Sequence, residues 1–209
     1  MDKNVSKLEL VSFKKNELFD KVIAHGLMQA KESLIIGTYN LQDIRISSNE
    51  SHQRNSLSDV ILSLLKRNVQ VLIVLAAFMQ KSRFIQTLSE KCHHHENIRI
   101  RFCRRMHLKA VIVDLKYAYF GSANLSGAGV GLKSLQKRNF ELGFITHDSD
   151  LIADIASTFM EIFNGKFCSK DRCHFFENSH LQDPCKGILH YQFWYRVWLL
   201  KNVKRRTRL

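Results

Sequence analysis

Apolar residues recur along the chain in two spacings, one typical of helices and one typical of buried strands. In chain order they predict a helix from Asn16, a strand over 33–39, a helix over 57–66, a strand over 69–76, a helix around 84–88 and a strand over 98–102. The polar segment 45–56 follows neither spacing, and we expect a surface loop there. Strands that alternate with helices in β-α-β-α-β order form a mostly parallel sheet.

The second half of the chain continues the pattern with shorter strands. Its predicted elements are strands over 108–112 and 117–119 with a turn at 114–116, a basic loop with glycines over 125–138, a strand over 139–146 and a helix over 148–163. Asp148 is expected to cap that helix, because aspartate accepts hydrogen bonds from the free N–H groups of a first turn. The predicted fold is therefore of the α/β class, with a mixed, mostly parallel sheet flanked by helices on both faces.

The composition of the chain changes after residue 166. Residues 167–187 are rich in Cys, His and charged side chains, residues 188–200 are aromatic and apolar, and the last nine residues are basic. We therefore expect one globular domain over residues 1–166 and a small C-terminal extension over residues 167–209.

The charge balance points to the class of partner. Lys and Arg outnumber Asp and Glu by 32 to 19, which gives a formal net charge of +13 and a pI near 9.7. Such a charge favours polyanions, either nucleic acid or an acidic membrane surface. The start of the chain lacks the apolar stretch of a signal peptide, and the longest apolar run is too short to span a bilayer. Five cysteines in no secreted-type framework favour a cytoplasmic protein.

The chemistry of the chain is concentrated between residues 107 and 124, where six positions follow the spacing H-x-K-x4-D-x6-G-S-x-N. They are His107, Lys109, Asp114, Gly121, Ser122 and Asn124. On a strand His107 and Lys109 would share a face, and the turn would return Ser122 and Asn124 beside them. Together an imidazole, an ammonium, a hydroxyl and an amide suit a phosphate, with the imidazole as nucleophile or acid–base group.

This spacing resembles the signature of the phospholipase D superfamily, and a chance match is expected only on the order of 10⁻⁸ per starting position. The segment Asn139–Gly143 is similar to the N-x-E segment of single-motif members, and the likeness spans roughly residues 8–166. It implies a phospholipase D-like fold and a phosphodiesterase whose catalytic residues are His107, Lys109, Ser122, Asn124 and Glu141. It implies no metal or other cofactor for catalysis.

The resemblance also assigns roles to single residues. Glu141 would accept a hydrogen bond from the imidazole and fix its tautomer. Asp114 and Gly121 are expected to be structural, with Asp114 holding its own tight turn through side-chain to backbone hydrogen bonds.

The chain contains one copy of the signature, whereas many superfamily members carry two. Single-motif members form homodimers, so the resemblance implies that two His107 side chains meet across a two-fold axis. One would attack phosphorus to form a phosphohistidine, and the other would protonate the leaving oxygen and then activate water.

The signature names a bond type and leaves the substrate open. The basic charge and the small size with a single motif favour a nuclease acting on DNA or RNA. The residues of the two motifs resemble those of superfamily members found beside helicases and in phage-defence or restriction systems. A helicase or another defence protein is therefore an expected partner. The alternatives are a lipid hydrolase, for which residues 188–200 would supply a membrane-docking face, and a non-catalytic nucleic-acid-binding subunit. We expect no membrane partner, because a helix packed on the core or on the dimer partner explains that segment as well.

The C-terminal extension carries a candidate metal site. Cys168, Cys173, His180 and Cys185 lie within 18 residues and suit a four-coordinate structural zinc, with His174 as an alternative fourth ligand. An iron–sulfur cluster is a lesser alternative, because only three cysteines lie close together. The run from Cys92 to His95 is not expected to be a site, because adjacent residues seldom share one metal.

Overall fold

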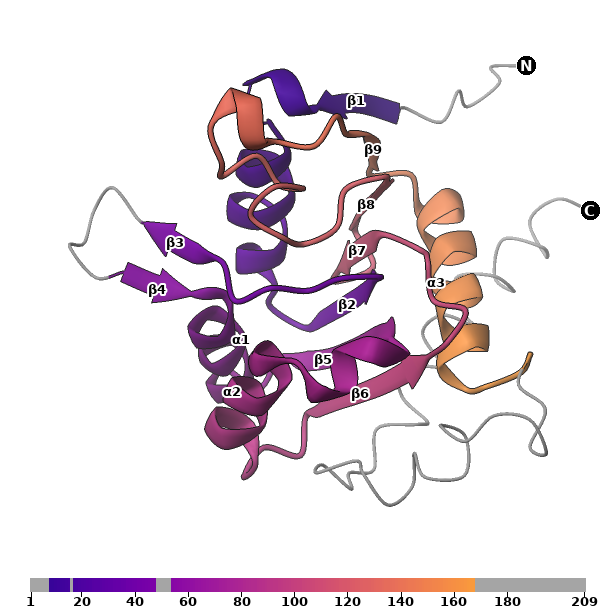
Figure 1. The fold of residues 1–209 in the computed structure, drawn as a ribbon. Coiled ribbons are helices and arrows are strands. Elements are labelled where there is room, and N and C mark those ends of the chain that lie inside the picture. Colours follow the sequence, from indigo (N-terminus) through magenta and orange to yellow (C-terminus); the bar gives the residue numbers. More distant parts are fainter. Residues whose placement is uncertain (1–7, 16, 48–53, 168–209) are drawn as a thin grey trace, which may run out of the picture.

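The computed structural model describes residues 8–15, 17–47 and 54–167. Seven strands form its main sheet: β1 Leu8–Ser12, β2 Ser33–Thr38, β5 Gln70–Ala76, β6 Ile98–Cys103, β7 Ala110–Val113, β8 Tyr117–Gly121 and β9 Leu142–Thr146. Their order across the sheet is β1-β9-β8-β7-β2-β5-β6 (Figure 1). The expected mixed sheet is confirmed, although only two of its six strand pairings are parallel.

The sheet consists of a parallel part and an antiparallel part. Strands β2, β5 and β6 are parallel, and the remaining pairings, from β2 through β7, β8 and β9 to β1, are antiparallel. Helices connect the parallel strands, as crossovers require, whereas a tight turn joins β7 to β8. The parallel part is thus confined to the strands whose sequence alternates with helices.

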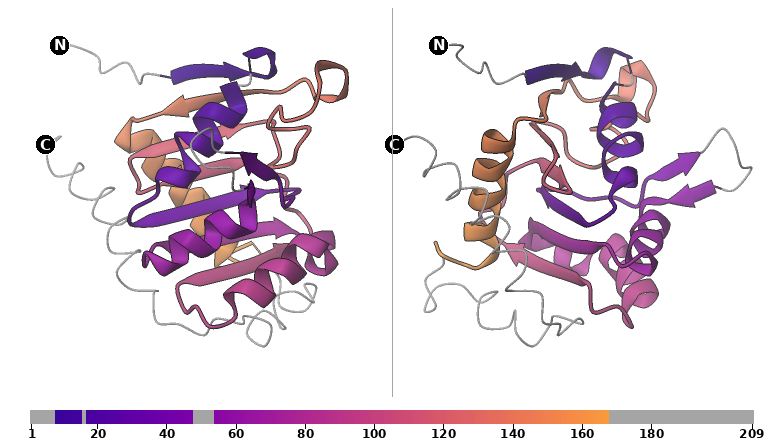
Figure 2. Two further views of the ribbon diagram at one scale, coloured as in Figure 1. Left: turned by 90° about the vertical axis from the view of Figure 1, so that its left-hand side faces the viewer. Right: turned by 180° about the vertical axis from the view of Figure 1, so that it is seen from behind.

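Helices cover both faces of the sheet, as predicted. The helices are η2 Leu18–Ala24, α1 Leu57–Lys66, α2 Arg83–Cys92 and α3 Ser149–Phe163. Figure 2 shows α3 on one face and the other three on the opposite face. Every residue of β2 is buried, because β2 lies between two strands and under helices on both sides.

The alternation of side chains along β2 divides the core in two. Ile35 packs in the cluster that contains Phe159 of α3, whereas Leu34 and Ile36 pack in the cluster that contains Ile61 of α1. Burial of each such side chain stabilises the fold by about 1.5–3 kcal/mol. The two clusters fix the sheet from both sides, so the loops at its ends have a rigid base.

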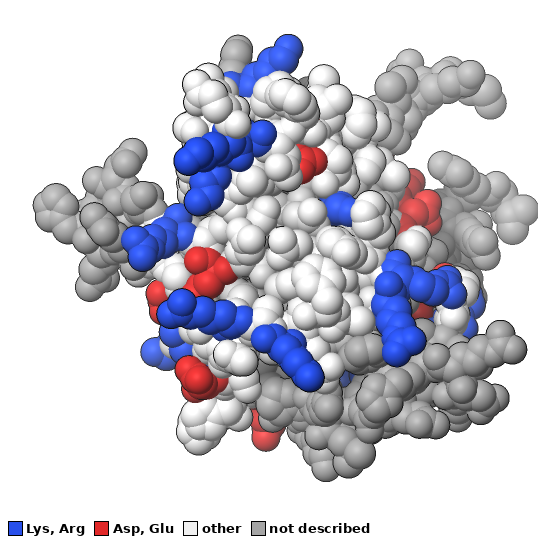
Figure 3. All heavy atoms as spheres, in the orientation of Figure 1, with Lys and Arg blue, Asp and Glu red and all other residues white. Residues whose placement is uncertain are grey.

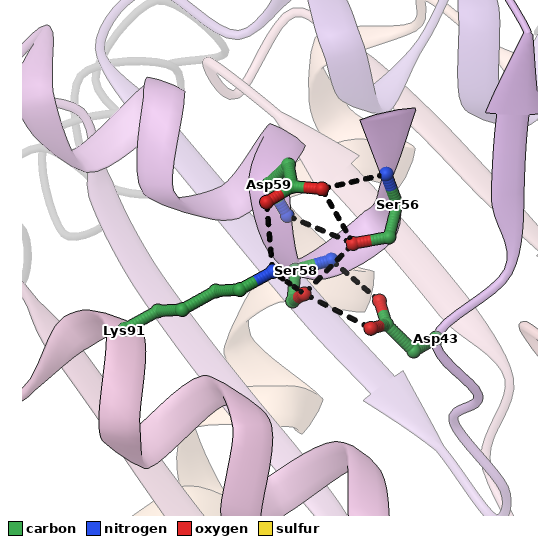
Figure 4. A network of polar contacts seen from close by, with 5 residues as sticks. All are labelled: Asp43, Ser56, Ser58, Asp59 and Lys91. Carbon is green, nitrogen blue, oxygen red and sulfur yellow. Dashed lines mark hydrogen bonds and ion pairs between the residues drawn. The ribbon is translucent and has the colours of Figure 1, made fainter. Parts of the chain in front are cut away.

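A polar network anchors the start of α1 (Figure 4). Ser56 and Asp59 form a capping box, and Lys91 of α2 reaches Asp59 Oδ1 at 2.7 Å. Asp43, from the loop after β2, accepts hydrogen bonds from the backbone N–H and the hydroxyl of Ser58 at 2.8 and 3.0 Å. The network therefore joins α1, α2 and the loop that follows β2. The predicted bounds of α1 and the cap of α3 at Asp148 are both confirmed.

Three predictions about local structure were wrong or incomplete. Segment 45–56 holds two short antiparallel strands, β3 Arg45–Ser47 and β4 Arg54–Ser56, where a loop was expected. Their one buried apolar residue is Ile46, and a single apolar position does not predict a strand. The helix from Asn16 ends at Ala24 and is followed by a separate 3₁₀ turn, Leu27–Gln29, because the backbone bends at Gly26. Strand β1 was not predicted, since three of its five residues are exposed and only its pairing with β9 defines it.

The C-terminal extension lies almost entirely outside the described residues. This includes all four proposed zinc ligands, Cys168, Cys173, His180 and Cys185. In the described part no helix is long and apolar enough to cross a membrane.

Candidate active site

All the signature residues except Asp114 lie at one end of the sheet, at the carboxyl end of β2 and the open end of the β7–β8 hairpin. The N–H of Gly121 donates to the carbonyl of Lys109 at 3.1 Å, so the first and last parts of the signature lie side by side. The hairpin closes at its other end in a tight turn, where Asp114 and Leu115 have φ of 53° and 52° and Lys116 N bonds Val113 O at 2.9 Å. Two consecutive left-handed residues match the twist of the paired strands.

His107 is exposed to solvent. Its ring lies edge-on to that of Tyr39, with ring centroids 5.5 Å apart. Strand β7 begins at Ala110, so the strand alternation that placed His107 and Lys109 on one face does not extend to them. The two side chains have different surroundings, because Lys109 is buried while His107 is open to solvent.

Lys109 supplies a buried positive charge. Its ammonium donates to the carbonyl of His107 at 2.7 Å and lies 5.7 Å from the centroid of the Tyr39 ring. Burial lowers the pKa of Lys109, and the negative charge of Glu141 opposes that shift. An ammonium with little water around it interacts strongly with an incoming phosphate, since the local dielectric is low.

Ser122 and Glu141 form a hydrogen-bonded pair. The Ser122 hydroxyl donates to Oε2 of Glu141, and the backbone N–H of Leu142 donates to the Ser122 oxygen at 3.1 Å. Asn139 holds the other carboxylate oxygen at 3.0 Å. A hydroxyl has one proton, so Ser122 cannot donate to a phosphate while it bonds Glu141. This geometry makes Ser122 a residue that positions Glu141.

Glu141 does not bond the imidazole of its own chain in this structure. Among the described residues, the hydrogen-bond partners of its carboxylate are Ser122 and Asn139. The carboxylate is buried, and it lowers the cost of burying the Lys109 ammonium nearby.

Asn124 is oriented by the strand beside it. Its side-chain oxygen accepts from Thr38 Oγ1 at 3.2 Å and from the backbone N–H of Asn40 at 3.1 Å. The NH₂ group of the amide is left as a donor for a ligand. Thr38, Tyr39 and Asn40 were not predicted as site residues. Their signal was their place at the end of a buried strand, where ligands bind in open α/β sheets.

Gly121 makes room for a buried tyrosine. A Cβ at Gly121 would lie 2.6 Å from the Cα of Gly143 and 2.7 Å from the Tyr119 hydroxyl oxygen, so no larger residue fits. That oxygen accepts from the N–H of Ala123 at 3.3 Å, which fixes the loop between Ser122 and Asn124. Burial raises the pKa of Tyr119 to about 12, so it stays a neutral phenol at physiological pH.

Asp114 lies at the far end of the hairpin, away from the other signature residues. Its carboxylate accepts hydrogen bonds from the backbone N–H groups of Lys31, Glu32 and Ser33 at 3.0, 2.8 and 2.8 Å. Asp114 therefore holds the entry to β2 instead of the turn in which it lies.

A shallow cavity adjoins His107 on the α3 side. Its volume is about 180 Å³, and its lining includes Cys103, Met106, Ile162 and Phe167. Arg105 also lines the cavity and is the one charged group that it adds beside His107; the rest of the lining is largely apolar. In the described part of the chain no group of three or more His, Cys, Asp or Glu side chains is placed to hold a metal.

Comparisons with known proteins agree with the signature. The family model "Cardiolipin synthase, PLD-like domain" matches residues 23–163. NucT from Helicobacter pylori is similar in fold, with a TM-score of 0.55 at 19% identity over 76% of this chain and 96% of that one. Nuc from Salmonella typhimurium, described as a phospholipase D family member, gives a TM-score of 0.54 at 16% identity over 77% and 95%. No curated protein sequence matches the chain.

Proposed function

Because the chain belongs to the phospholipase D superfamily, we propose that it is a phosphodiesterase that cleaves DNA or RNA through a phosphohistidine intermediate. One observation carries the proposal: the fold places an exposed His107 and a buried, charged Lys109 together with Asn124 and Glu141 at one end of the sheet. This is a nucleophile beside a phosphate-binding group and an oriented donor.

The reaction has two displacements at phosphorus. A ring nitrogen of His107 attacks the phosphodiester, the bond from phosphorus to the leaving oxygen breaks, and a phosphohistidine forms. A second group must protonate the leaving oxygen. Water then attacks phosphorus and the P–N bond breaks, while the second group takes the proton from water. Lys109 and the NH₂ group of Asn124 stabilise the charge on the other phosphate oxygens.

The second acid–base group comes from another copy of the chain. The other described histidines lie at the opposite end of the sheet: His25, His93, His94, His95 and His147. His147, for example, donates to the carbonyl of Lys116 in the β7–β8 turn. A homodimer with His107 near its two-fold axis supplies the missing imidazole without any further residue.

An apolar surface beside the site supports this dimer. The surface consists of Leu8, Leu10, Phe140, Leu142 and Phe144, which are 38% to 86% exposed. On the paired strands Leu10 lies opposite Phe144, and Leu142 directly follows the buried Glu141. Exposed apolar side chains gathered in this way are typical of protein interfaces.

The net charge of +13 supports a nucleic-acid substrate over a neutral one. We further propose that a helicase or another defence-system protein is the partner in a phage-defence or restriction setting.

We also propose that the C-terminal extension binds a structural zinc through Cys168, Cys173, His180 and Cys185. The zinc content of the purified full-length chain, measured with and without Cys168→Ser, tests the last point.

The main experiment tests the substrate and the two-histidine mechanism together. The full chain is offered DNA, RNA and anionic phospholipid vesicles in Mg²⁺-free buffer, and we expect cleavage of nucleic acid. It is then mixed with increasing amounts of His107→Ala and allowed to exchange subunits. If both histidines are needed, activity follows the fraction of wild-type dimers, about a quarter in an equal mixture. A linear decline, or cleavage of lipid alone, would contradict the proposal.

A further inference from the structure

Two aromatic side chains lie exposed beside the catalytic histidine. Tyr39 directly follows β2, and Phe78 lies in the 3₁₀ turn Ala77–Lys81 that follows β5. Because β2 and β5 are parallel neighbours, their carboxyl ends meet at the same edge of the sheet. The two ring centroids are 4.9 Å apart and the rings are tilted by 51°. The pair is therefore held by the sheet and not by a long loop.

The core does not account for this pair. Tyr39 is 40% exposed and Phe78 is 56% exposed, whereas their chain neighbours Thr38 and Met79 are buried. Full burial of an aromatic side chain would stabilise the fold by about 1.5–3 kcal/mol, and these two partly exposed side chains contribute much less than that. An exposed aromatic pair at the catalytic end of a sheet is typical of a ligand-binding surface.

The pair is continuous with the catalytic residues. The Tyr39 ring contacts both the imidazole of His107 and the ammonium of Lys109, at centroid distances of 5.5 and 5.7 Å. A phosphate held by these two groups would lie beside Tyr39, and Phe78 would lie one ring further out. In a nucleic acid, the base is separated from its phosphate by one sugar, which matches this order of groups.

Positive charge surrounds this aromatic surface. Lys81 and Arg83 are exposed just after Phe78, and Arg105 is exposed after β6, the next parallel strand. Figure 3 shows a largely uncharged centre with most Lys and Arg side chains toward the rim, where some Asp and Glu side chains also lie. Aromatic faces for bases and surrounding cations for the phosphate backbone are the two components of single-strand binding sites.

We propose that Tyr39 and Phe78 form a stacking platform for the base next to the scissile phosphate, and that this platform selects single-stranded nucleic acid. The inference rests on the proposed nuclease function and adds the substrate's form to it. In a duplex both faces of a base are covered by its neighbours, so the platform can act only on an unstacked base. An acyl chain would also fit an apolar surface, but it gains nothing from the surrounding cations.

Binding is the first test, because it does not depend on cleavage. The His107→Gln chain is titrated with a fluorescent single-stranded oligonucleotide, with the same strand carrying one run of abasic sites, and with the duplex. Stacking is worth about 1–3 kcal/mol per base, so Phe78→Ala should weaken binding of the normal strand by about 5- to 150-fold. For the abasic strand Phe78→Ala should cause little change, and Phe78→Trp should bind the normal strand at least as tightly as the parent.

Leu135→Ala is the matched control, because Leu135 is 63% exposed but lies in the loop between β8 and β9. We expect no change in binding there. Equal affinity of the parent and Phe78→Ala for the normal strand would overturn the inference. A change of oligomeric state in Phe78→Ala by light scattering, or a loss confined to binding of phosphatidylglycerol vesicles, would overturn it in favour of an interface or a lipid site.

Activity separates this inference from the proposed function. If the wild-type chain binds single strands through Phe78 but does not cut them, the nuclease proposal fails and the platform stands. If the wild-type chain cuts single strands and duplexes equally well and Phe78→Ala leaves KM for both unchanged, the nuclease proposal stands and the platform is wrong.

Discussion

The two ends of the β7–β8 hairpin hold signature residues in opposite ways. At the open end, His107 is exposed and the NH₂ group of Asn124 is left as a donor after its oxygen is bonded twice. At the turn end, Asp114 accepts hydrogen bonds from three successive backbone N–H groups. One end leaves polar groups available for a ligand, and the other uses its carboxylate to hold the chain.

The contrast shows that membership of a motif does not define a role. All six positions follow one spacing, yet Asp114 and Gly121 act on the backbone, and the Ser122 hydroxyl is bonded to Glu141. The role of each residue depends on which of its hydrogen-bond donors and acceptors the fold leaves available for a ligand. The five predictions below test this division from the largest effect to the smallest.

The largest effect is expected from a histidine at the open end. His107→Gln should lower the rate of phosphodiester cleavage by at least about 10³-fold, because it removes the proposed nucleophile. Since the side chain is exposed, the free energy of unfolding should change by no more than about 0.5 kcal/mol. Initial rates at saturating substrate and urea denaturation measure the two quantities.

His147→Gln is the control from the turn end. Its Nδ1 donates to the carbonyl of Lys116 at 3.1 Å, so its role is structural. Activity per folded molecule should stay at the wild-type level. If both histidine variants lose activity equally, the division between the two ends is wrong.

Lys109→Met is expected to lower the rate by about 10²–10³-fold, the usual effect of removing one group that stabilises transition-state charge. The fold should keep or gain stability, because a buried ammonium is costly. Far-UV circular dichroism and thermal unfolding check the fold, and steady-state kinetics check the loss. A large drop in stability would indicate that the ammonium is structural.

The pH dependence of the wild type tests the same residue. Burial lowers the pKa of Lys109, so activity should decline on the alkaline side below the pH at which an ordinary lysine loses its proton. Stability should respond in the opposite direction. The folded-state pKa lies below the unfolded one, so the destabilisation by this group is full at low pH and is relieved as pH rises between the two values. In Lys109→Met both effects should disappear.

Asp114→Ala should destabilise the chain and leave the chemistry intact. It removes the acceptor for the N–H groups of Lys31, Glu32 and Ser33, at a cost of about 1–3 kcal/mol. Asp114→Asn keeps one side-chain oxygen and tolerates the positive φ, so it should lose less. The rate per folded molecule should match that of the wild type in both, and a rate that falls with Tm unchanged would place Asp114 in the active site.

The sequence was most informative where an element buries a whole strand or one continuous helix face. Strand β2 and helix α1 were predicted with nearly their observed bounds. The unbroken apolar run of β2 fits only a buried strand, and the apolar spacing of α1 fits only a helix. It was least informative at the edges. Strands β1, β3 and β4 have few buried residues, and only their partners, distant in sequence for β1, make them strands.

For the site, the spacing located the residues but not their contacts. It placed His107, Lys109, Ser122 and Asn124 together, as the hairpin shows. It could not show that Glu141 binds Ser122, or that Asp114 reaches residues 31–33, because these contacts join segments about 20 and 80 residues apart. Nor did it identify Tyr39, whose role depends on which strand ends beside His107.

The smallest effect is expected for the polar network at the start of α1. Its polar groups are bonded to one another, as the polar groups at the turn end of the β7–β8 hairpin are bonded within the chain. The hydrogen bond from Lys91 lowers the pKa of Asp59 to about 2. A lowered carboxyl pKa adds stability above the unfolded value near pH 4, and this stability is lost as pH falls toward 2. Because Asp59 is 42% exposed, solvent screening reduces the contribution to about 0.5–1 kcal/mol.

Urea denaturation of the wild type and of Lys91→Met at pH 7 and pH 3 measures this contribution. The variant should be less stable than the wild type by about 0.5–1 kcal/mol at pH 7, and the gap should narrow at pH 3, where Asp59 of both chains becomes protonated in the unfolded state. A gap that stays constant with pH would mean that Lys91 acts by packing alone. In that case the network of Figure 4, unlike the Asp114 contacts, would not stabilise the fold through the charge of its carboxylate.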